Sequence, residues 1–393
     1  MWGGYSRLKH PIKKRTFVPV SVVFYIQEVN VLLRTYKFRL YPTSEQQEKI
    51  RCTLERCRLL YNRLLAERIH AYKTEGKALT YSQQANTFRE RKQYIPALKE
   101  VHSQVLQDVA RRLDKAYQAF YRRVKNGEKA GFPRFKPQSR YDSFTYPQSG
   151  FALEGTRLEL SKIGLVRIQL HRQLRGTIKT CTITEKNGRY YACLSCEFEA
   201  EPLPLTNRQV GVDLGVRQLA ATSDGSIFEA PKPLRKSEAK LKRQQKAVSR
   251  KQRGSNRRRK AVLTLARQHE RVANQRKDYA HQVSRTLVNR YDLIAFEELN
   301  VRGMVKNHHL AKTIADAGWS GLVQFVTYKA ESAGRQVVRV DPRYTSQCCS
   351  TCHHIVKKTL AERIHRCKQC GTTLDRDVNA AINILARAKR QVS

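Results

Sequence analysis

The sequence predicts a multidomain α+β protein, and three observations lead to that fold class. The chain has 393 residues, enough for two or three domains. Residues 43–126 carry apolar side chains at helical spacing, whereas residues 150–200 alternate as short strands. Residues 204–393 mix strands with helices and contain a cluster of cysteines. Segments of different texture that follow one another in this way indicate separate structural units.

The first clear periodicity is a strand over residues 34–41. RTYKFRLY alternates polar and apolar side chains, and Pro42 ends the pattern. Residues 1–32 are basic and then apolar, like a signal peptide, but the apolar part is short and contains Pro19. We expect residues 1–32 to form a weakly ordered extension.

A helical bundle is predicted for residues 43–126. After a first long helix, a second helical stretch covers Tyr81 to Arg91 and a third covers Leu98 to Lys125. Because strand patterns lie on both sides, we interpret the bundle as an insertion into a β-domain made of residues 33–42 and 127–203.

The strands between residues 150 and 200 include one well-defined hairpin. Asn187-Gly188 is the dipeptide preferred in two-residue hairpin turns. Cys193 and Cys196 lie in the same pattern as a C-x-x-C pair without a second pair nearby. We therefore favour packing over metal binding for these two cysteines.

An aspartate interrupts the next predicted strand, VGVDLG. Val210, Val212 and Leu214 point to one side, and Asp213 points to the other. A carboxylate in a buried strand must find a partner or lose its charge, because burying a lone ion is costly. The strand therefore raises the question of what Asp213 binds.

The remaining chain alternates basic helices with short strands. Residues 232–290 are helical and strongly basic, with a break at residues 254–256. The later predicted elements are a strand at 292–297, a helix at 315–334, a strand at 337–340 and a final helix from about Val378.

The net charge of +43 and the pI of about 10.3 indicate a polyanionic partner. A membrane surface is the less favoured alternative, because no single amphipathic basic helix dominates and the basic residues are spread over the whole length. No segment is long and apolar enough to span a bilayer. Between Lys232 and Lys260 the only acid is Glu238, so this segment is expected to run along phosphates rather than form an ordinary solvated face. The candidate phosphate contacts are Lys242, Arg243, Arg250, Arg257 and Arg258.

The strongest single motif is a pair of C-x-x-C sequences. Five of the ten cysteines lie within residues 348–370. Two such pairs can supply four thiolates to a tetrahedral zinc ion, and a site without an open position is structural. Coincidental or redox-active pairs are the alternative, and Cys348 and His353 leave the ligand set open. The two pairs are formed by Cys349, Cys352, Cys367 and Cys370.

Three acids end on or near central elements of the C-terminal unit: Asp213, Glu297 and Asp377. Each alone is more often a helix cap or a surface charge, and Asp375 is the better N-cap for the final helix. Gathered together on a basic chain, they suggest Mg²⁺ ions and phosphodiester hydrolysis.

GVDLG also resembles the phosphate-binding hairpin of the actin and Hsp70 ATPases. Those proteins need a second glycine-rich phosphate loop, which is not visible in this sequence. The basic balance also disfavours an ordinary ATPase.

Several of these motifs, in their order and spacing, resemble the TnpB family. TnpB proteins are RNA-guided nucleases of bacterial and archaeal insertion sequences, ancestral to type V CRISPR effectors. The resemblance covers residues 34–390 and also includes YKFRLYPTSEQQ and GFPRFK. The motifs are GVDLGV, FEELN with Val301-Arg302-Gly303-Met304, TSQCCSTC with CKQCG, and LDRDVNAAINI.

The resemblance implies a fold and a set of site residues. Residues 204–393 would form an RNase H-like RuvC nuclease domain with a zinc ribbon inserted at 345–373, and the β-domain would be a β-barrel wedge carrying residues 43–126 as its recognition lobe. Two Mg²⁺ ions would be held by an acidic triad, for which the family pattern selects Glu297 over Glu298 and Asp377 over Asp375. The two C-x-x-C pairs would hold structural Zn²⁺, and His353 departs from the glycine usual at its position.

The resemblance also implies partners. One protein would bind one guide RNA in a prokaryotic cytoplasm, the RNA would pair with double-stranded target DNA, and the protein would read a short flanking motif. Candidate readers, which could equally be ordinary surface residues, are Tyr81, Ser103, Gln104 and Gln107.

Three other functions were weighed against guided cleavage. One is a nuclease-inactive guided repressor, although all three acids are present. Another is a zinc-ribbon DNA-binding protein that needs no RNA. A direct transposase would need a nucleophilic tyrosine with a metal-binding histidine pair, and no such constellation is found in the sequence.

Overall fold

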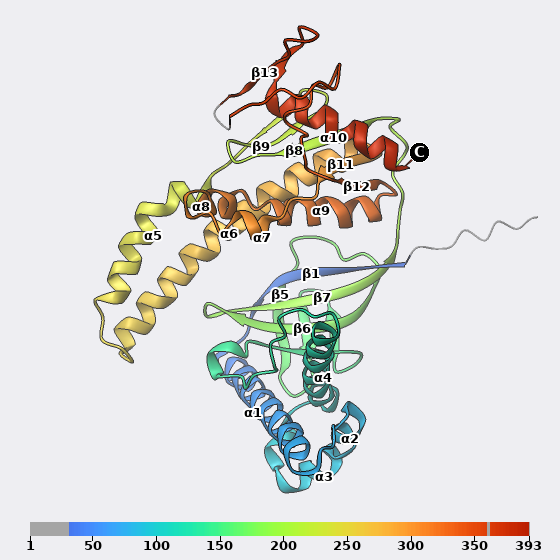
Figure 1. Cartoon of the computed structure of the whole chain (residues 1–393). Coiled ribbons are helices and arrows are strands. Elements are labelled where there is room, and N and C mark those ends of the chain that lie inside the picture. Colours follow the sequence, from blue (N-terminus) through green and yellow to red (C-terminus); the bar gives the residue numbers. More distant parts are fainter. Residues whose placement is uncertain (1–30, 360–361, 393) are drawn as a thin grey trace, which may run out of the picture.

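The computed structural model describes residues 31–359 and 362–392. It contains two large sheets, each with its own apolar core, and the chain passes from one to the other through residues 200–208 (Figure 1). Most of the expected N-terminal extension lies outside the described residues. Val31 and Leu32, however, belong to the first strand, so the strand begins earlier than predicted because the pairing with residues 198–199 continues to its end.

The N-terminal sheet is antiparallel and has β1 near its centre. Its strand order in the described chain is β2-β6-β7-β1-β5-β4-β3. Asn187 and Gly188 connect β6 to β7 with positive φ angles of 54° and 69°, which confirms the predicted hairpin turn. The strands are β1 (Val31–Tyr41), β2 (Ser143–Tyr146), β3 (Phe151–Glu154), β4 (Arg157–Leu160), β5 (Gly164–Gln169), β6 (Thr177–Lys186) and β7 (Arg189–Glu199).

The helical insertion packs on this sheet. Helix α1 (Ser44–Glu75) starts at a capping box in which Thr43 and Gln46 exchange hydrogen bonds. The other insertion elements are α2 (Tyr81–Asn86), α3 (Phe88–Tyr94), the 3₁₀ turn η1 (Pro96–Glu100) and α4 (Ser103–Lys125); η2 (Gln138–Arg140) follows. Apolar side chains of α1 and α4 share one continuous core with those of β1 and β7.

Two helix predictions in the insertion were wrong in detail. The second helix is divided at Thr87, whose hydroxyl donates to the carbonyl of Gln84 at 2.7 Å. The third helix begins at Ser103 instead of Leu98, because Pro96 starts a separate 3₁₀ turn.

The C-terminal sheet is mixed. Its order, within the described residues, is β10-β9-β8-β11-β12, with β11 parallel to both β8 and β12. The strands are β8 (Gln209–Leu214), β9 (Gln218–Thr222), β10 (Ile227–Glu229), β11 (Leu293–Glu297) and β12 (Gln336–Val340). The other elements are α5 (Pro233–Ser249), α6 (Asn256–Arg290), α7 (Val301–Met304), α8 (His308–Ala317), α9 (Trp319–Ser332), β13 (Ile364–Arg366), β14 (Thr373–Asp375) and α10 (Arg376–Val392).

Helices cover both faces of this sheet (Figure 1). Helices α6 and α9 pack on one face together with Val210 and Val212, and α10 packs on the other. A Cβ atom at Gly211 would lie 2.0 Å from the carbonyl oxygen of Ala381, so the glycine allows α10 to approach β8 closely. The predicted helix at 315–334 is two helices, since Gly318 at φ 68° ends α8.

Helices α5 and α6 form a long basic hairpin, the α5–α6 arm, that projects from the sheet (Figure 1). The tip of the β6–β7 hairpin touches it: Asn187 Nδ2 donates to Glu270 at 3.0 Å, and Arg267 Nε donates to the carbonyl of Asn187 at 3.3 Å. The two sheets are thus linked at a second point. None of the helices in the described part of the chain has the length and apolar character needed to cross a membrane.

Candidate functional site

The three predicted acids come from three elements and converge at one edge of the C-terminal sheet. Asp213 lies near the end of β8, and Glu297 is the last residue of β11. Because β8 and β11 are parallel neighbours, their carboxyl ends meet at the same edge. Asp377 stands in the first turn of α10, which packs on β8.

The charges of the three acids act on one another. Burial raises the pKa of Asp213 well above its ordinary value, and the negative charges of Glu297 and Asp377 raise it further. Burial also raises the pKa of Glu297. Glu298, the other acid of that segment, is exposed. The structure therefore brings Glu297, and not Glu298, to the cluster.

Arginine side chains hold Asp377. Arg376 donates to Asp377 Oδ1 from Nε at 3.0 Å and from Nη2 at 2.8 Å, and Arg363 lies 4.0 Å from Oδ2. Asp375 caps α10 by accepting from the backbone N–H groups of Asp377 and Val378, at 2.8 and 3.2 Å. Asp377 is therefore not needed as the helix cap, and its carboxylate can face the other two acids. The three carboxylates do not converge as tightly as the four cysteine sulfurs described below.

Glu297 has a partner that the sequence analysis missed. The hydroxyl of Thr345 contacts the Glu297 carboxylate, and the same oxygen lies 3.0 Å from the carbonyl of Pro342. Thr345 begins the TSQCC motif, and its place beside the first C-x-x-C pair is the only feature of the sequence that sets it apart. In the structure it is buried.

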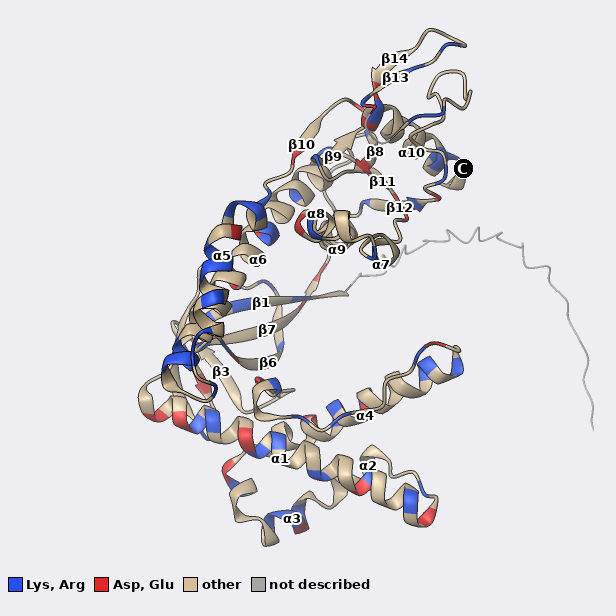
Figure 2. Cartoon of the chain, turned by 60° about the vertical axis from the view of Figure 1, so that its left-hand side comes forward, with Lys and Arg blue, Asp and Glu red and all other residues tan. Residues whose placement is uncertain are grey.

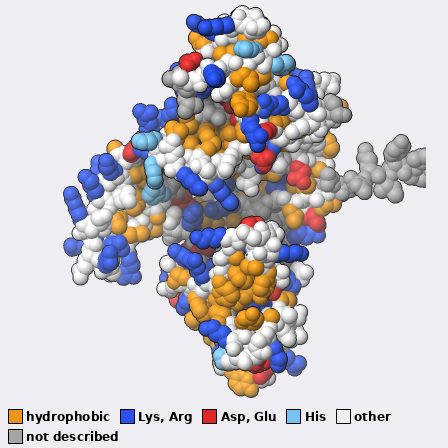
Figure 3. Space-filling model, in the orientation of Figure 1, with side chains coloured by type: hydrophobic (Ala, Val, Ile, Leu, Met, Phe, Trp, Pro, Cys, Tyr) orange, Lys and Arg blue, Asp and Glu red, His pale blue; other side chains and the backbone are white. Residues whose placement is uncertain are grey.

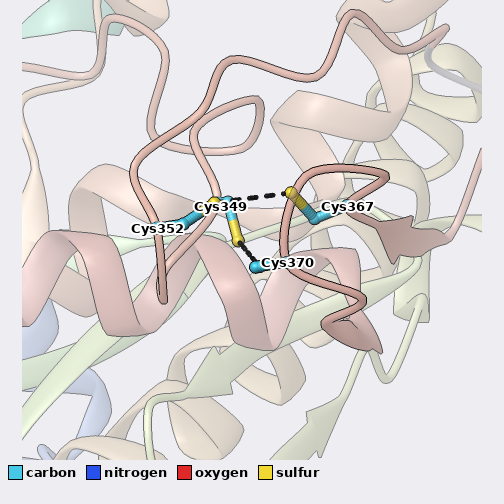
Figure 4. A group of neighbouring side chains, drawn as sticks. All are labelled: Cys349, Cys352, Cys367 and Cys370. Atoms are coloured by element: carbon cyan, nitrogen blue, oxygen red, sulfur yellow. Dashed lines mark hydrogen bonds between the residues drawn. The ribbon is translucent and has the colours of Figure 1, made fainter.

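Four cysteines converge as the paired C-x-x-C spacing predicts (Figure 4). Their sulfur atoms all lie within 4.8 Å of one another, with Cys349 to Cys370 at 3.6 Å and Cys352 to Cys367 at 3.5 Å. Four convergent thiols are the donor set of a structural zinc site, so these residues fit the ion.

The surroundings favour the thiolate at two of the four cysteines. Burial opposes ionisation of Cys349, but backbone N–H groups of Cys352 and Thr351 lower its pKa to about 7. The hydroxyl and the backbone N–H of Thr372 lower the pKa of Cys370 to about 6. Zinc binds the thiolate form, so both shifts assist the ion. At Cys352 the backbone N–H of His354 lowers the pKa, but burial and the three neighbouring thiols outweigh it and raise the pKa to about 12.

Neither neighbour competes as a ligand. The Cys348 thiol donates to the carbonyl of His353 at 3.4 Å and stands outside the convergent group. His353 adopts φ 62°, the left-handed conformation that glycine prefers and that histidine adopts more readily than most residues. The knuckle turn is therefore kept despite the departure from glycine.

Cys193 and Cys196 do not form a metal site of this kind. Cys196 is buried in the N-terminal core, and burial raises the pKa of both thiols. Among the described residues, no group of potential metal ligands includes either thiol.

The predicted phosphate contacts lie on the α5–α6 arm. Lys242, Arg243, Arg250 and Arg257 are exposed and Arg258 is partly buried. Basic residues follow both helices in Figure 2, and Figure 3 shows Lys and Arg side chains gathered over the same arm. The one acid of the segment, Glu238, is neutralised by Lys312 at 2.5 Å.

The four candidate readers lie on two neighbouring helices of the insertion, α2 and α4. Gln107 is exposed, and Ser103 accepts from Lys92 Nζ at 2.7 Å. Gln104 already accepts from the backbone N–H of Ser149 at 2.9 Å. The Tyr81 ring is partly buried with Arg111 5.7 Å from its centre.

Family models match most of the chain. Residues 191–308 match the OrfB_IS605 family, described as a probable transposase, and residues 319–384 match the Cas12f1-like TNB domain. Residues 31–77 match a helix-turn-helix domain of the same OrfB family. In this structure the latter segment is strand β1 followed by the single long helix α1.

Curated relatives cover nearly the whole chain. The "putative RNA-guided DNA endonuclease InsQ" of Escherichia coli K12 is 35% identical in a 375-residue alignment that covers 90% of this chain and 92% of that protein. A "putative RNA-guided DNA endonuclease" of Streptomyces pristinaespiralis is 35% identical over 362 residues, covering 90% and 89%.

A solved structure shares the fold. The Cas12f1 chain in a cryo-EM complex with sgRNA and target DNA superposes with a TM-score of 0.58 at 13% identity, covering 90% of this chain and 99% of that chain. The mixed α/β fold is therefore Cas12f-like, and the four cysteines belong to a zinc-ribbon-like TNB domain.

Proposed function

Because the chain belongs to the TnpB (OrfB) family, we propose that it is an RNA-guided DNA endonuclease. The observation that carries the proposal is the meeting of Asp213, Glu297 and Asp377 from three separate elements at one sheet edge. Buried carboxylates that repel one another persist in a fold when a cation or a proton offsets their charge. The gathering therefore favours a divalent-metal site over three unrelated surface acids.

The sheet topology supports a RuvC-type nuclease domain. Three antiparallel strands, β10, β9 and β8, continue into the parallel strands β11 and β12, and α10 packs across β8. This strand order is that of an RNase H-like fold, in which the central strand supplies the first acid. We propose residues 204–393 as this domain, the zinc ribbon 345–373 as its insertion, and the N-terminal sheet as a wedge domain carrying residues 43–126.

The three carboxylates would hold two Mg²⁺ ions, which when bound would activate a water molecule and stabilise the leaving oxygen of the scissile phosphate. Arg376 and Arg363 balance the charge of Asp377, and burial together with the neighbouring carboxylates raises the pKa of Asp213.

Guide and target would follow the basic surface. We assign phosphate contacts to the exposed basic residues of the α5–α6 arm, because Glu238, the only acid between Lys232 and Lys260, is paired with Lys312. The guide RNA reads the target sequence by pairing, and the protein reads a short flanking motif. For that motif we propose Tyr81, Ser103, Gln104 and Gln107. Ser103 and Gln104 are already hydrogen-bonded to Lys92 and Ser149, whereas the Gln107 side chain is exposed.

The experiment is cleavage by the protein purified with its copurifying RNA, which is sequenced to identify the guide. We expect matched duplex DNA to be cut in Mg²⁺, and cutting to be lost in EDTA and in Asp213→Ala. Glu297→Gln should also abolish cutting, whereas Glu298→Gln should retain it because Glu298 is exposed outside the cluster.

Other outcomes identify the rival functions. Guide-dependent binding without cutting by the unaltered protein would make it a guided repressor. DNA binding without any discrete RNA would make it a zinc-ribbon DNA-binding protein.

A further inference from the structure

A chain of buried hydrogen bonds joins the four-cysteine site to the acidic cluster. At its first step, Asn379 and Asn383 of α10 both donate to the carbonyl of Cys348, at 2.8 and 2.7 Å. Asn379 Oδ1 also accepts from the backbone N–H of Ser350 at 3.0 Å. Cys349 lies between Cys348 and Ser350, so side chains of α10 bind the backbone on both sides of this proposed zinc ligand.

The second step leads from α10 to the acid. Asn383 Nδ2 also donates to the carbonyl of Thr345 at 2.9 Å, which fixes the backbone of that residue. The Thr345 hydroxyl has one proton and two acceptors within reach, Glu297 and the carbonyl of Pro342. An ionised carboxylate is the stronger acceptor, so the proton points to Glu297.

The side chains of this network are buried, so their hydrogen bonds have no substitute from solvent. The exposed fractions are 3% for Thr345, 0% for Asn379 and 5% for Asn383. Water cannot replace a broken bond at such positions, so the geometry of one member constrains the next. The same helix carries Asp377, so the knuckle, α10 and Glu297 form one connected unit.

We propose that Thr345 is a positioning residue, through which the zinc ribbon fixes the Glu297 carboxylate for the divalent cation. This role rests on the proposed nuclease function. The zinc ribbon would then act on the acidic cluster as well as stabilise the fold. Zinc would fix the first cysteine knuckle, Asn383 connects that knuckle to the backbone of Thr345, and the Thr345 hydroxyl orients the Glu297 carboxylate. Partners that orient a metal ligand from behind typically change metal affinity or activity about 10–100-fold when removed.

The test uses Thr345→Val, which keeps the side-chain shape and removes the hydroxyl, and Thr345→Ser, which restores it. The matched control is Thr359→Val, because the Thr359 hydroxyl bonds an acid outside the cluster, Glu362, at 2.8 Å. Each guide-bound protein is measured for zinc content, target binding, affinity for Mn²⁺ by titration calorimetry, and single-turnover cleavage against Mg²⁺ concentration.

We expect Thr345→Val to keep its zinc and its target binding but to weaken Mn²⁺ affinity roughly 10-fold and to shift the Mg²⁺ requirement upward by a similar factor. Thr345→Ser and Thr359→Val should behave like the unaltered protein. Unchanged Mn²⁺ affinity in Thr345→Val would overturn the proposal, and so would loss of zinc, which would show a purely structural role.

The two proposals can fail separately. If the unaltered protein binds Mn²⁺ at the acidic cluster but cuts nothing, the nuclease function fails while the Mn²⁺ titration still decides the role of Thr345. If Asp213→Ala binds Mn²⁺ as well as the unaltered protein, the ion is bound elsewhere and both proposals fail.

Discussion

The ionised carboxylate of Asp213 is expected to destabilise the metal-free protein, because it is surrounded by other carboxylates. Asp213 lies on the same face of β8 as Gly211, which admits α10 at close range. Burial and the charges of Glu297 and Asp377 all raise its pKa, whereas Arg376 opposes the shift. Active sites commonly keep such unfavourable charges because function requires them.

Asp213→Asn should therefore stabilise the metal-free protein while abolishing cleavage. A carboxyl whose pKa is raised on folding contributes stability at low pH, and this contribution is lost as the pH rises through the folded pKa. The amide has no such loss, so the advantage of the variant should grow from pH 5 to pH 8 and reach roughly 1–3 kcal/mol.

The measurement is the thermal midpoint of the guide-bound complex in EDTA across that pH range, with Glu298→Gln as the control at an exposed acid. Adding Mg²⁺ should stabilise only the unaltered protein. A variant that is less stable than the unaltered protein at pH 8 would show that Asp213 has a favourable partner without metal.

At the same scale, the sequence was informative where a residue departs from its local pattern. Asp213 stands out in an apolar strand, and the cysteines stand out by spacing, so both groups could be named. Thr345 could not, because its role depends on a contact with Glu297, 48 residues away. Nothing near Thr345 in the chain indicates which side chain it will meet.

At the scale of elements, the α5–α6 arm is anchored by one buried acid, Asp316 of α8. Its carboxylate accepts from the backbone N–H of Leu234 at 3.1 Å and of Arg235 at 3.4 Å, and pairs with Arg276 at 3.2 Å. Asp316 thus caps α5 from outside that helix, where Lys232 at the N-cap position makes no side-chain cap, and also ties α8 to α6.

Asp316→Ala should loosen the base of the arm. Loss of the cap and of the partner of Arg276 should weaken the anchorage by about 2 kcal/mol, which corresponds to roughly 30-fold faster cleavage of the arm by trypsin. Limited proteolysis of the guide-bound protein would measure this rate. Asp278→Ala, at an exposed acid of α6, should be cut like the unaltered protein. Equal rates for both variants would contradict an anchoring role of Asp316.

Element boundaries show why the fold was only partly predictable. The longer strands and helices of the C-terminal unit were predicted in their order because each carries its own period, and the arm was found from its charge, whereas the short elements α7, β13 and β14 were not predicted. The divisions at Thr87 and Gly318 were missed, because apolar periodicity continues across both points. The first strand was assigned to the same β-domain as residues 127–203, but its pairing with β7, more than 140 residues away along the chain, was not predicted, since alternation alone does not identify a partner strand.

At the scale of the whole molecule, charge is the dominant property. Lys and Arg number 76 against 33 Asp and Glu, and the excess follows the arm rather than the acidic cluster (Figure 2). A polyanion that lies along the arm would release counterions from its phosphates, so its affinity must fall steeply with salt. This separates the surface that supplies affinity from the sheet edge that would perform cleavage.

The double variant Lys242→Ala/Arg243→Ala should therefore change the salt dependence of binding more than its sequence specificity. Each lost phosphate contact lowers the slope of log K against log salt by about 0.7–0.9, so the slope should fall by about 1.5 if both side chains contact phosphate. Arg175→Ala is the control, because Arg175 is already paired with Glu201 at 3.2 Å. Binding of guide RNA and of guided target would be measured from 50 to 300 mM salt.

The result also shows whether the arm contributes to sequence reading or only binds phosphates. If the double variant lowers the slope but still discriminates matched from mismatched targets, sequence reading resides in the paired RNA and the arm acts only on phosphates. If the slope is unchanged, Lys242 and Arg243 face solvent in the complex, and the nucleic-acid path must lie on another face of α5 or α6. The pairing of Glu238 with Lys312 near the base of the arm favours the first outcome, because it offsets the charge of the one acid between Lys232 and Lys260 that could repel a phosphate backbone.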